Sequence, residues 1–249
     1  MKNIHSIKIS IVTLFPDFVL QYTSFGIIAR AIARKLLRFG PVDLRAFGIG
    51  ERKTVDDRPY GGGVGMVLRP DVLYKAITRA KGLGIRAKEN TRIILLTPSG
   101  KKFVQKDAVR LSKYDHLVFV SGRYEGYDER ITKFVDEQLS IGDYVLMGGE
   151  LPALVITEAV LRHVPGVLGK DESVVGESFS EERVLEYPQY TKPEILEVRM
   201  RKKELRTVRT LRVPQVLRSG HHANINVWRK QEAAKRMKKF RPDLLPSDE

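Results

Sequence analysis

The segment HLVFVSGRYEGYDER, residues 116–130, gives the clearest indication of how this chain folds. Its first six residues are mostly aliphatic or aromatic and predict a buried strand, and the glycine-rich turn 122–126 follows at once. The same order occurs upstream, where a strand predicted over Arg92–Thr97 leads into TPSGK (97–101). Parallel strands in α/β proteins bind ligands at their carboxyl ends. Two strands that end in this way therefore predict a parallel sheet with a ligand site at one edge.

A third glycine-rich segment, SIGDYVLMGGELP (140–152), surrounds a strand that we expect at Tyr144–Leu146. Glycine lets the backbone come close to a ligand and donate N–H groups to it. No G-x-G-x-x-G follows a strand, and Ser99–Lys102 lacks the glycine spacing of a phosphate loop, so the sequence argues against a dinucleotide or ATP site. The three loops suit a ligand that is bound by backbone N–H groups and apolar walls.

The first two thirds of the chain alternate between strand-like and helix-like segments, which predicts an α/β domain with helices on both faces of its sheet. The other expected strands are 8–15 and 42–47, and the expected helices are 24–39, 71–81, 103–113 and 152–163. From Pro165 to Tyr190 no clear period is present, so a loop or linker is expected there. Beyond it, basic helices are expected over 193–211 and 223–239.

The composition narrows the class of protein. The net charge is +14, and residues 191–241 hold sixteen lysines and arginines against four acids, which favours a polyanionic partner such as nucleic acid. The absence of cysteine excludes disulfides, Cys-bound metal clusters and thiolate nucleophiles. No apolar run is long enough to span a bilayer, and the first ten residues lack the pattern of a signal peptide. We therefore expect a cytoplasmic protein with no membrane contact.

Eleven short segments occur in the order in which one known family carries them. From about Ile9 to Leu245 the chain closely resembles the TrmD family, the tRNA (guanine-37 N1)-methyltransferases of the SPOUT class. The segments are LFPDF (14–18), RAIARKLL (30–37), TVDDRPYGGGVGM (54–66), LLTPSGK (95–101), SGRYEGYDER (121–130), SIGDYVLMGGELPALV (140–155), VPGVLG (164–169), ESFSE (177–181), YPQYTKPE (187–194), VPQVLRSGHHANI (213–225) and RPDLL (241–245).

The resemblance implies an α/β fold of the SPOUT type, in which the parallel sheet carries a deep trefoil knot, plus a small C-terminal helical domain. It implies a catalytic domain that binds S-adenosylmethionine over 1–168, a linker over 169–177 and a basic tRNA-binding domain over 178–249. The three glycine-rich loops would form the knot and hold S-adenosylmethionine in a bent shape. The protein would be a homodimer with both active sites at the interface, and tRNA would be its substrate.

The resemblance also implies which residues carry the reaction. Glu177 aligns with the family's general base, which is usually Asp, and Arg162 aligns with the arginine that stabilises charge at O6 of the guanine. Asp56 and Gly65 would contact the substrate, and Glu125 and Glu177 are the candidates for holding Mg²⁺. The cofactor would be bound by Leu95, Leu96, Thr97, Pro98, Gly122, Tyr124, Glu125, Gly126, Ile141, Gly142, Tyr144, Leu146, Gly148 and Gly149.

The sequence departs from the family pattern in two further places. Val64 stands where proline is usual, and the basic insert EVRMRKKELRTVRTLR (197–212) is longer than the family has there. We expect the insert to be either an added helix that contacts tRNA or an extended solvated helix. Two other functions stay open: a SPOUT enzyme that acts on ribosomal RNA or at a 2′-hydroxyl, and a non-catalytic RNA-binding protein. The intact loop segments argue against the second.

Overall fold

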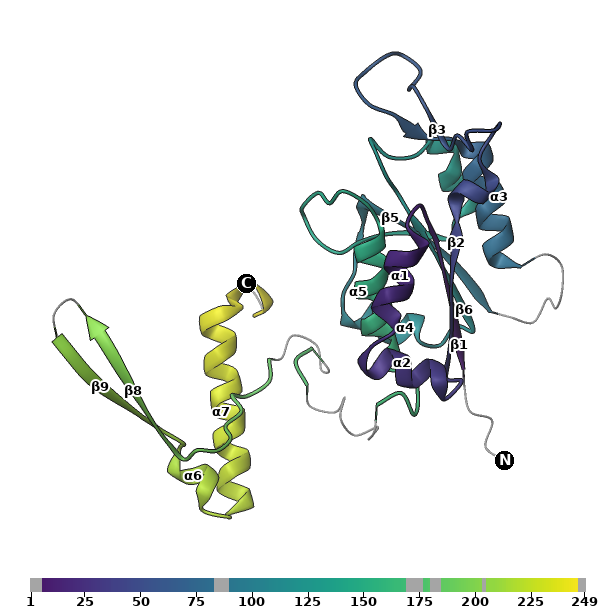
Figure 1. Cartoon of the computed structure of the whole chain (residues 1–249). Helices are drawn as coiled ribbons and strands as arrows, with labels where there is room; N and C mark the ends of the chain where they lie inside the picture. The colour runs from purple at the N-terminus through teal and green to yellow at the C-terminus, as the bar shows by residue number, and fades with distance from the viewer. Residues whose placement is uncertain (1–5, 83–89, 169–176, 180–184, 203–204, 246–249) are drawn as a thin grey trace, which may run out of the picture. The chain divides into compact units, whose positions relative to one another are not determined.

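The structure is a computed structural model that describes residues 6–82, 90–168, 177–179, 185–202 and 205–245, except for the side chains of 199–202 and 205–207. The chain forms two compact units, residues 1–173 and 174–249. The first is built on a five-stranded sheet, and the second consists of a β-hairpin and helices (Figure 1). Most of the predicted linker, 169–176, lies outside the described residues.

All neighbouring strands of the five-stranded sheet are parallel, as predicted, and their order is β2-β1-β6-β5-β7. Alternate residues of the central strands enter two separate cores. Phe119 and Leu96 enter the first core, while Val120 and Leu95 enter the second, which is the period-two alternation of a sheet covered on both faces. The strands are β1 (Ile7–Thr13), β2 (Leu37–Asp43), β5 (Thr91–Lys102), β6 (His116–Ser121) and β7 (Glu137–Ser140).

Helices cover both faces of this sheet (Figure 1). The first core is closed by α1 (Pro16–Thr23), α2 (Gly26–Ala33), α4 (Gln105–Leu111) and α5 (Glu150–Leu161). The second core is closed by α3 (Pro70–Lys81) with the short 3-10 helices η1 (Leu44–Phe47) and η2 (Glu129–Phe134). A small antiparallel pair is formed by β3 (Asp56–Asp57) and β4 (Val67–Leu68), which lie between η1 and α3 in the sequence.

Four predictions for this unit are wrong. The strand expected over 42–47 ends at Asp43, because residues 44–47 form the 3-10 helix η1, and the loop expected at 97–101 is part of β5, where the segment pairs with β7. The helix expected over 24–39 ends at Ala33, because Lys35 turns the chain with a φ of 60° and Leu37 begins β2. Pro41 is tolerated in β2 because this strand lies at the edge of the sheet. The strand expected at Tyr144–Leu146 is a loop with exposed apolar side chains, and the strand is instead the preceding segment β7.

The second unit corrects the prediction for the basic insert. In place of a helix over 193–211, the chain forms an antiparallel hairpin of β8 (Ile195–Lys202) and β9 (Leu205–Arg212). It is followed by α6 (Gln215–Arg218), by α7 (His222–Phe240), which confirms the second basic helix, and by the 3-10 helix η4 (Pro242–Leu244). Within the described residues, none of the helices combines the length and the apolar character that crossing a membrane requires.

Candidate active site

Residues 96–98, within β5, and the loops that follow β6 and β7 meet around one cavity of about 420 Å³. Thirteen of the fourteen residues expected at the cofactor line it: Leu96, Thr97, Pro98, Gly122, Tyr124, Glu125, Gly126, Ile141, Gly142, Tyr144, Leu146, Gly148 and Gly149. Leu95 does not, because the alternation of β5 turns its side chain into the second core, where it is fully buried. The cavity has the size of ordinary small-molecule sites, about 300–1,000 Å³.

Further residues line the cavity that the sequence did not single out. They are Arg123, Tyr127, Glu129, Leu139, Ser140, Val145, Met147 and Pro152. Most are neighbours of predicted residues in the same loops, so the loop boundaries were a sufficient signal for them. Leu139 and Ser140 were missed because β7 was expected after them rather than at them.

Glycines let neighbouring segments of the site pack directly against one another. A Cβ on Gly149 would come 2.6 Å from Cα of Ser121, and a Cβ on Gly100 would come 2.6 Å from the backbone of Leu139. Real Cβ atoms do not approach this closely, so both positions require glycine. The N–H of Gly149 also donates to the carbonyl of Gly122 at 3.0 Å, which joins the loop after β7 to the loop after β6.

The glycine-rich segment 54–66 reaches the same site. The N–H of Glu125 donates to the carbonyl of Met66 at 3.1 Å, and Gly65 has a φ of +88°. A Cβ at Gly65 would lie within 3 Å of the Glu125 side chain, so the Glu125 side chain can adopt its position only because residue 65 is glycine. Asp56, the other predicted substrate contact, lies on β3 opposite Leu68, and neither Asp56 nor Gly65 lines the cavity itself.

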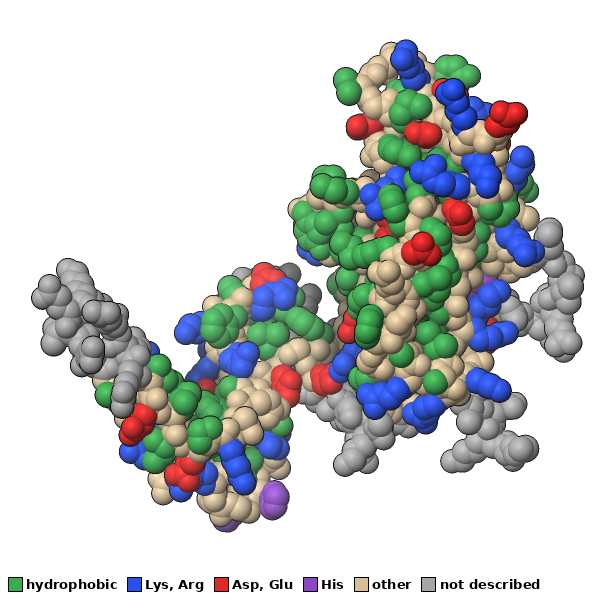
Figure 2. Space-filling view, viewed as in Figure 1, with side chains coloured by type: hydrophobic (Ala, Val, Ile, Leu, Met, Phe, Trp, Pro, Cys, Tyr) green, Lys and Arg blue, Asp and Glu red, His purple; other side chains and the backbone are tan. Residues whose placement is uncertain are grey.

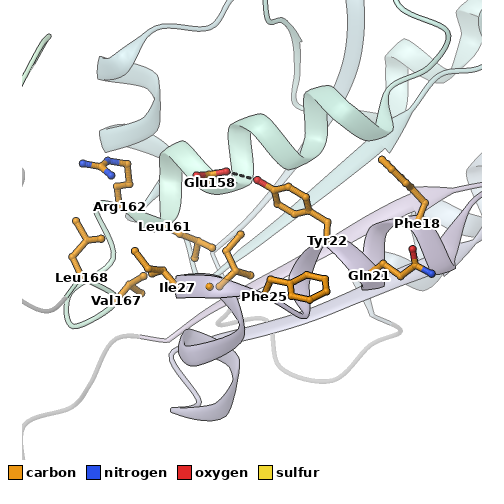
Figure 3. A pocket seen from close by; sticks show the side chains of 12 residues that line it. Phe18, Gln21, Tyr22, Phe25, Ile27, Glu158, Leu161, Arg162, Val167 and Leu168 are labelled. Atoms are coloured by element: carbon orange, nitrogen blue, oxygen red, sulfur yellow. Dashed lines mark hydrogen bonds between the residues drawn. The ribbon is translucent and has the colours of Figure 1, made fainter. Parts of the chain in front are cut away.

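Arg162 lies elsewhere on the first unit. It is the C-cap of α5, whereas Gly149, at the cavity, is the N-cap of the same helix. Arg162 lines a second cavity of about 690 Å³, whose other walls are mainly apolar residues of α1, α2 and the segment after α5 (Figure 3). Tyr22 donates a hydrogen bond to Glu158 in this cavity, and that bond, with burial, raises the pKa of Tyr22 to about 12.

Glu177 belongs to the second unit, on the described stretch 177–179. The hydroxyl of the next residue, Ser178, accepts a hydrogen bond from the N–H of Glu186 at 3.0 Å. The ring of Phe179 lies 5.8 Å from the guanidinium carbon of Arg241, just beyond the end of α7. These two contacts fix the stretch that carries Glu177 to the C-terminal unit.

Among the described residues, no group of three His, Asp or Glu side chains could together hold a metal ion. The wall of the cavity consists mainly of glycine backbone, tyrosines and aliphatic side chains, and it includes the carboxylates Glu125 and Glu129. Backbone N–H groups suit the polar edges of a nucleoside ligand, the apolar walls suit a flat base, and the two carboxylates suit a positively charged group.

Comparison with known proteins agrees with this geometry. The family model described as tRNA (Guanine-1)-methyltransferase TrmD matches residues 7–247. A curated relative from Thermus thermophilus, named tRNA (guanine-N(1)-)-methyltransferase, is 46% identical over 238 residues, which cover 96% of this chain and 91% of the relative. Relatives of the same name from Shouchella clausii and Staphylococcus aureus are 43% and 44% identical, again over 96% of this chain and 91% and 90% of their own lengths. The chain therefore belongs to the TrmD family of tRNA (guanine-N1)-methyltransferases.

Proposed function

We propose that this protein transfers a methyl group from S-adenosylmethionine to N1 of guanine-37 in tRNA, beside the anticodon. The observation that carries the proposal is the convergence of three glycine-rich segments on one cavity, in a chain whose family acts on guanine N1 in tRNA. S-adenosylmethionine supplies an activated methyl group on a good leaving group, so the protein has to align a nucleophile and exclude water. The tRNA substrate also makes the cytoplasm the proposed compartment.

The nucleophile needs help from the chain's own residues. N1 of guanine carries a proton and attacks poorly until that proton is removed. We assign this task to Glu177, which keeps the carboxylate of the family's usual Asp on a side chain that is one methylene longer. As the proton leaves, negative charge develops at O6, and the guanidinium of Arg162 is the proposed group that stabilises it.

The positions of these groups support a homodimer with shared active sites. Gly149 and Arg162 cap opposite ends of α5, and at about 1.5 Å per residue they lie roughly 20 Å apart. An arginine at that distance is too far from the cavity of its own chain to act at the methyl group. A two-fold pairing that brings the C-terminal end of α5 from one copy to the cavity of the other solves this.

The surface around Arg162 has the character that such pairing needs. Large apolar side chains stand exposed on α1, α2 and α5, among them Phe18, Phe25, Ile27, Leu151 and Val155. Figure 2 shows hydrophobic side chains gathered on this side of the first unit. We propose a second copy of the chain as the partner. The wild-type protein should sediment as a dimer, and Phe25→Asp, at a residue 75% exposed in one chain, should sediment as a monomer.

We also propose the deep trefoil knot of the SPOUT class. It is supported by the close approach of Gly100 in β5 to Leu139 in β7, and of Gly149 in the loop after β7 to Ser121 at the end of β6. The register shift between Leu96 and Lys101, where β5 changes its pairing with β7, occurs at the same place.

The second unit is the proposed tRNA-binding part. Lysine and arginine side chains are visible on its surface (Figure 2). Such side chains bind the phosphates of RNA whatever the base sequence is. The register of the β8–β9 hairpin brings basic residues of the two strands into one ladder, in which Arg201 is paired with Arg206. This hairpin is proposed to contact the tRNA backbone. For Mg²⁺, which is commonly held by one or two carboxylates and water, the proposed ligands are Glu125 and Glu177.

The chemical identity of the product tests the proposal. The protein is incubated with methyl-labelled S-adenosylmethionine and a tRNA transcript, and the RNA is digested to nucleosides. The label should appear in 1-methylguanosine. Label in a 2′-O-methylated nucleoside, or label in ribosomal RNA but not in tRNA, would favour the alternative SPOUT activities. An RNA-binding protein without activity would transfer no label and would show no heat of binding with S-adenosylhomocysteine.

A further inference from the structure

Arg123, in the wall of the cavity, joins several separate segments of the chain. Its Nε donates to Oε2 of Glu150 at 3.1 Å, and one terminal nitrogen lies 3.1 Å from the same oxygen. The other terminal nitrogen donates to the carbonyl of Met147 at 3.2 Å. The guanidinium carbon lies 4.4 Å from the ring centre of Phe15, and Arg123 pairs through its backbone with Gly148.

Glu150 anchors this arrangement to the sheet. It is the first residue of α5 and is 1% exposed. Its second oxygen, Oε1, accepts a hydrogen bond from the hydroxyl of Thr13 at 2.8 Å, and Thr13 in turn accepts one from the N–H of Phe15 at 2.9 Å. A buried carboxylate is costly unless both oxygens have partners, and here both have them. The end of β1, the start of α5 and the loop after β6 are thus joined through one ion pair.

The ion pair occupies the space that a side chain at position 148 would need. A Cβ on Gly148 would lie 2.3 Å from Nε of Arg123. The end of an arginine side chain usually gives way to such a neighbour, but this guanidinium is held by Glu150, Met147 and Phe15 and has nowhere to move without losing them. Glycine at 148 is therefore a requirement of the Arg123–Glu150 pair.

We propose that Arg123 and Glu150 are positioning residues for the methyl donor: their ion pair fixes the loops 122–126 and 147–149 in the shape that binds it. The pair acts through the backbone of these loops and takes no part in the chemical step. This inference rests on the proposed function, because it assumes that the cavity holds S-adenosylmethionine. It gives the buried Glu150 and the stacking of Phe15 a role in cofactor affinity rather than in stability alone.

The test is a set of variants in the full-length protein: Glu150→Gln, Arg123→Lys, Gly148→Ala and the double variant of the first two. The dissociation constant of S-adenosylhomocysteine is measured by calorimetry, and KM for each substrate is measured with kcat. Each single variant should weaken S-adenosylhomocysteine and raise KM for S-adenosylmethionine by about ten- to hundredfold, the effect of losing one hydrogen bond between charged groups. KM for tRNA, and kcat at saturating donor, should stay within about threefold.

The double variant separates a shared function from two independent ones. If Arg123 and Glu150 act as a pair, Arg123→Lys with Glu150→Gln should bind S-adenosylhomocysteine no more weakly than the weaker single variant. Arg92→Lys is the matched control, because Arg92 also pairs with a partly buried carboxylate, Glu137, at 2.9 Å, but near the amino end of β5. It should leave the affinity unchanged.

Phe15→Leu keeps the proposal testable if the buried variants do not fold. Phe15 is 44% exposed, so its loss should not unfold the protein, while removal of the ring beneath the guanidinium should weaken S-adenosylhomocysteine about two- to fivefold. Wild-type affinity in Glu150→Gln and Arg123→Lys, or equal losses for donor and tRNA, would overturn the inference. A wild-type protein that does not bind S-adenosylhomocysteine would instead overturn the proposed function.

Discussion

Shared active sites make a quantitative prediction for mixed dimers. Arg162→Ala removes the proposed charge-stabilising group, and a lost donor of this kind costs about 10²–10³ in kcat. Leu146→Glu puts a carboxylate into the apolar wall of the cavity, at a side chain that is 39% exposed and so needs no repacking of the core. Each variant alone should be nearly inactive, the first with cofactor binding intact and the second without it.

The two variants are then co-expressed with different tags, and the mixed dimer is purified through both. One of its sites joins the intact loops of the Arg162→Ala chain to Arg162 of the Leu146→Glu chain, while the other site has both defects. The mixed dimer should therefore show about half of the wild-type activity per dimer. The basis is the distance of roughly 20 Å between the two ends of α5. If the mixed dimer is no more active than the two variants alone, each site lies within one chain, and the separation along α5 does not imply shared sites.

Three other predictions follow from single residues or segments. Glu177→Gln should lower kcat about 10²–10⁴-fold and leave S-adenosylhomocysteine binding unchanged, while Glu177→Asp should stay active. If the Gln variant is as active as the wild-type protein in single-turnover assays, Glu177 is not the base. Replacing Arg201, Arg206 and Arg212 by glutamine should make the association constant for tRNA less dependent on salt. The slope of log K against log salt should become shallower by roughly 0.7–0.9 for each phosphate that the hairpin no longer neutralises, and kcat at saturating tRNA should be retained. An unchanged slope would show that the hairpin does not contact the RNA. Burial, helped by Lys8 and Arg38, lowers the pKa of His116 to about 4 from 6.5, so the unfolded chain binds one proton more between these values. Stability should be full above pH 6.5 and fall by about 3 kcal/mol as the pH drops to 4, and His116→Gln should remove this slope in urea unfolding; identical slopes in both proteins would refute it.

The ligand loops were predictable from the sequence because their signals are local. A run of aliphatic residues followed by glycines identifies β6 and the loop after it, and β6 is confirmed at both ends, whereas β5 continues through its glycine segment to Lys102. The one misplaced residue, Leu95, was included with its neighbour Leu96, although alternation along a strand puts the two side chains on opposite faces of the sheet.

Other features depend on interactions that the sequence does not display. The insert is rich in arginine and lysine, which form helices well. At its start, however, Leu196 and Val198 alternate with Glu197 and Arg199 at the period of a strand, and cross-strand pairing decided the outcome. Arg162 was expected to stabilise charge at the guanine because of the family resemblance, and only the length of α5 shows how far it lies from the cavity of its own chain. Glu150, a plain acidic helix start in the sequence, proves to be a buried partner of Arg123.

The most direct test of the central claim compares tRNA transcripts that differ only at nucleotide 37. With purified protein and methyl-labelled S-adenosylmethionine, the transcript with guanine at this position should accept close to one methyl group per molecule, and transcripts with adenine, cytosine or uracil there should accept none. Methylation at equal rates whatever base occupies position 37, or none with guanine, would contradict the account.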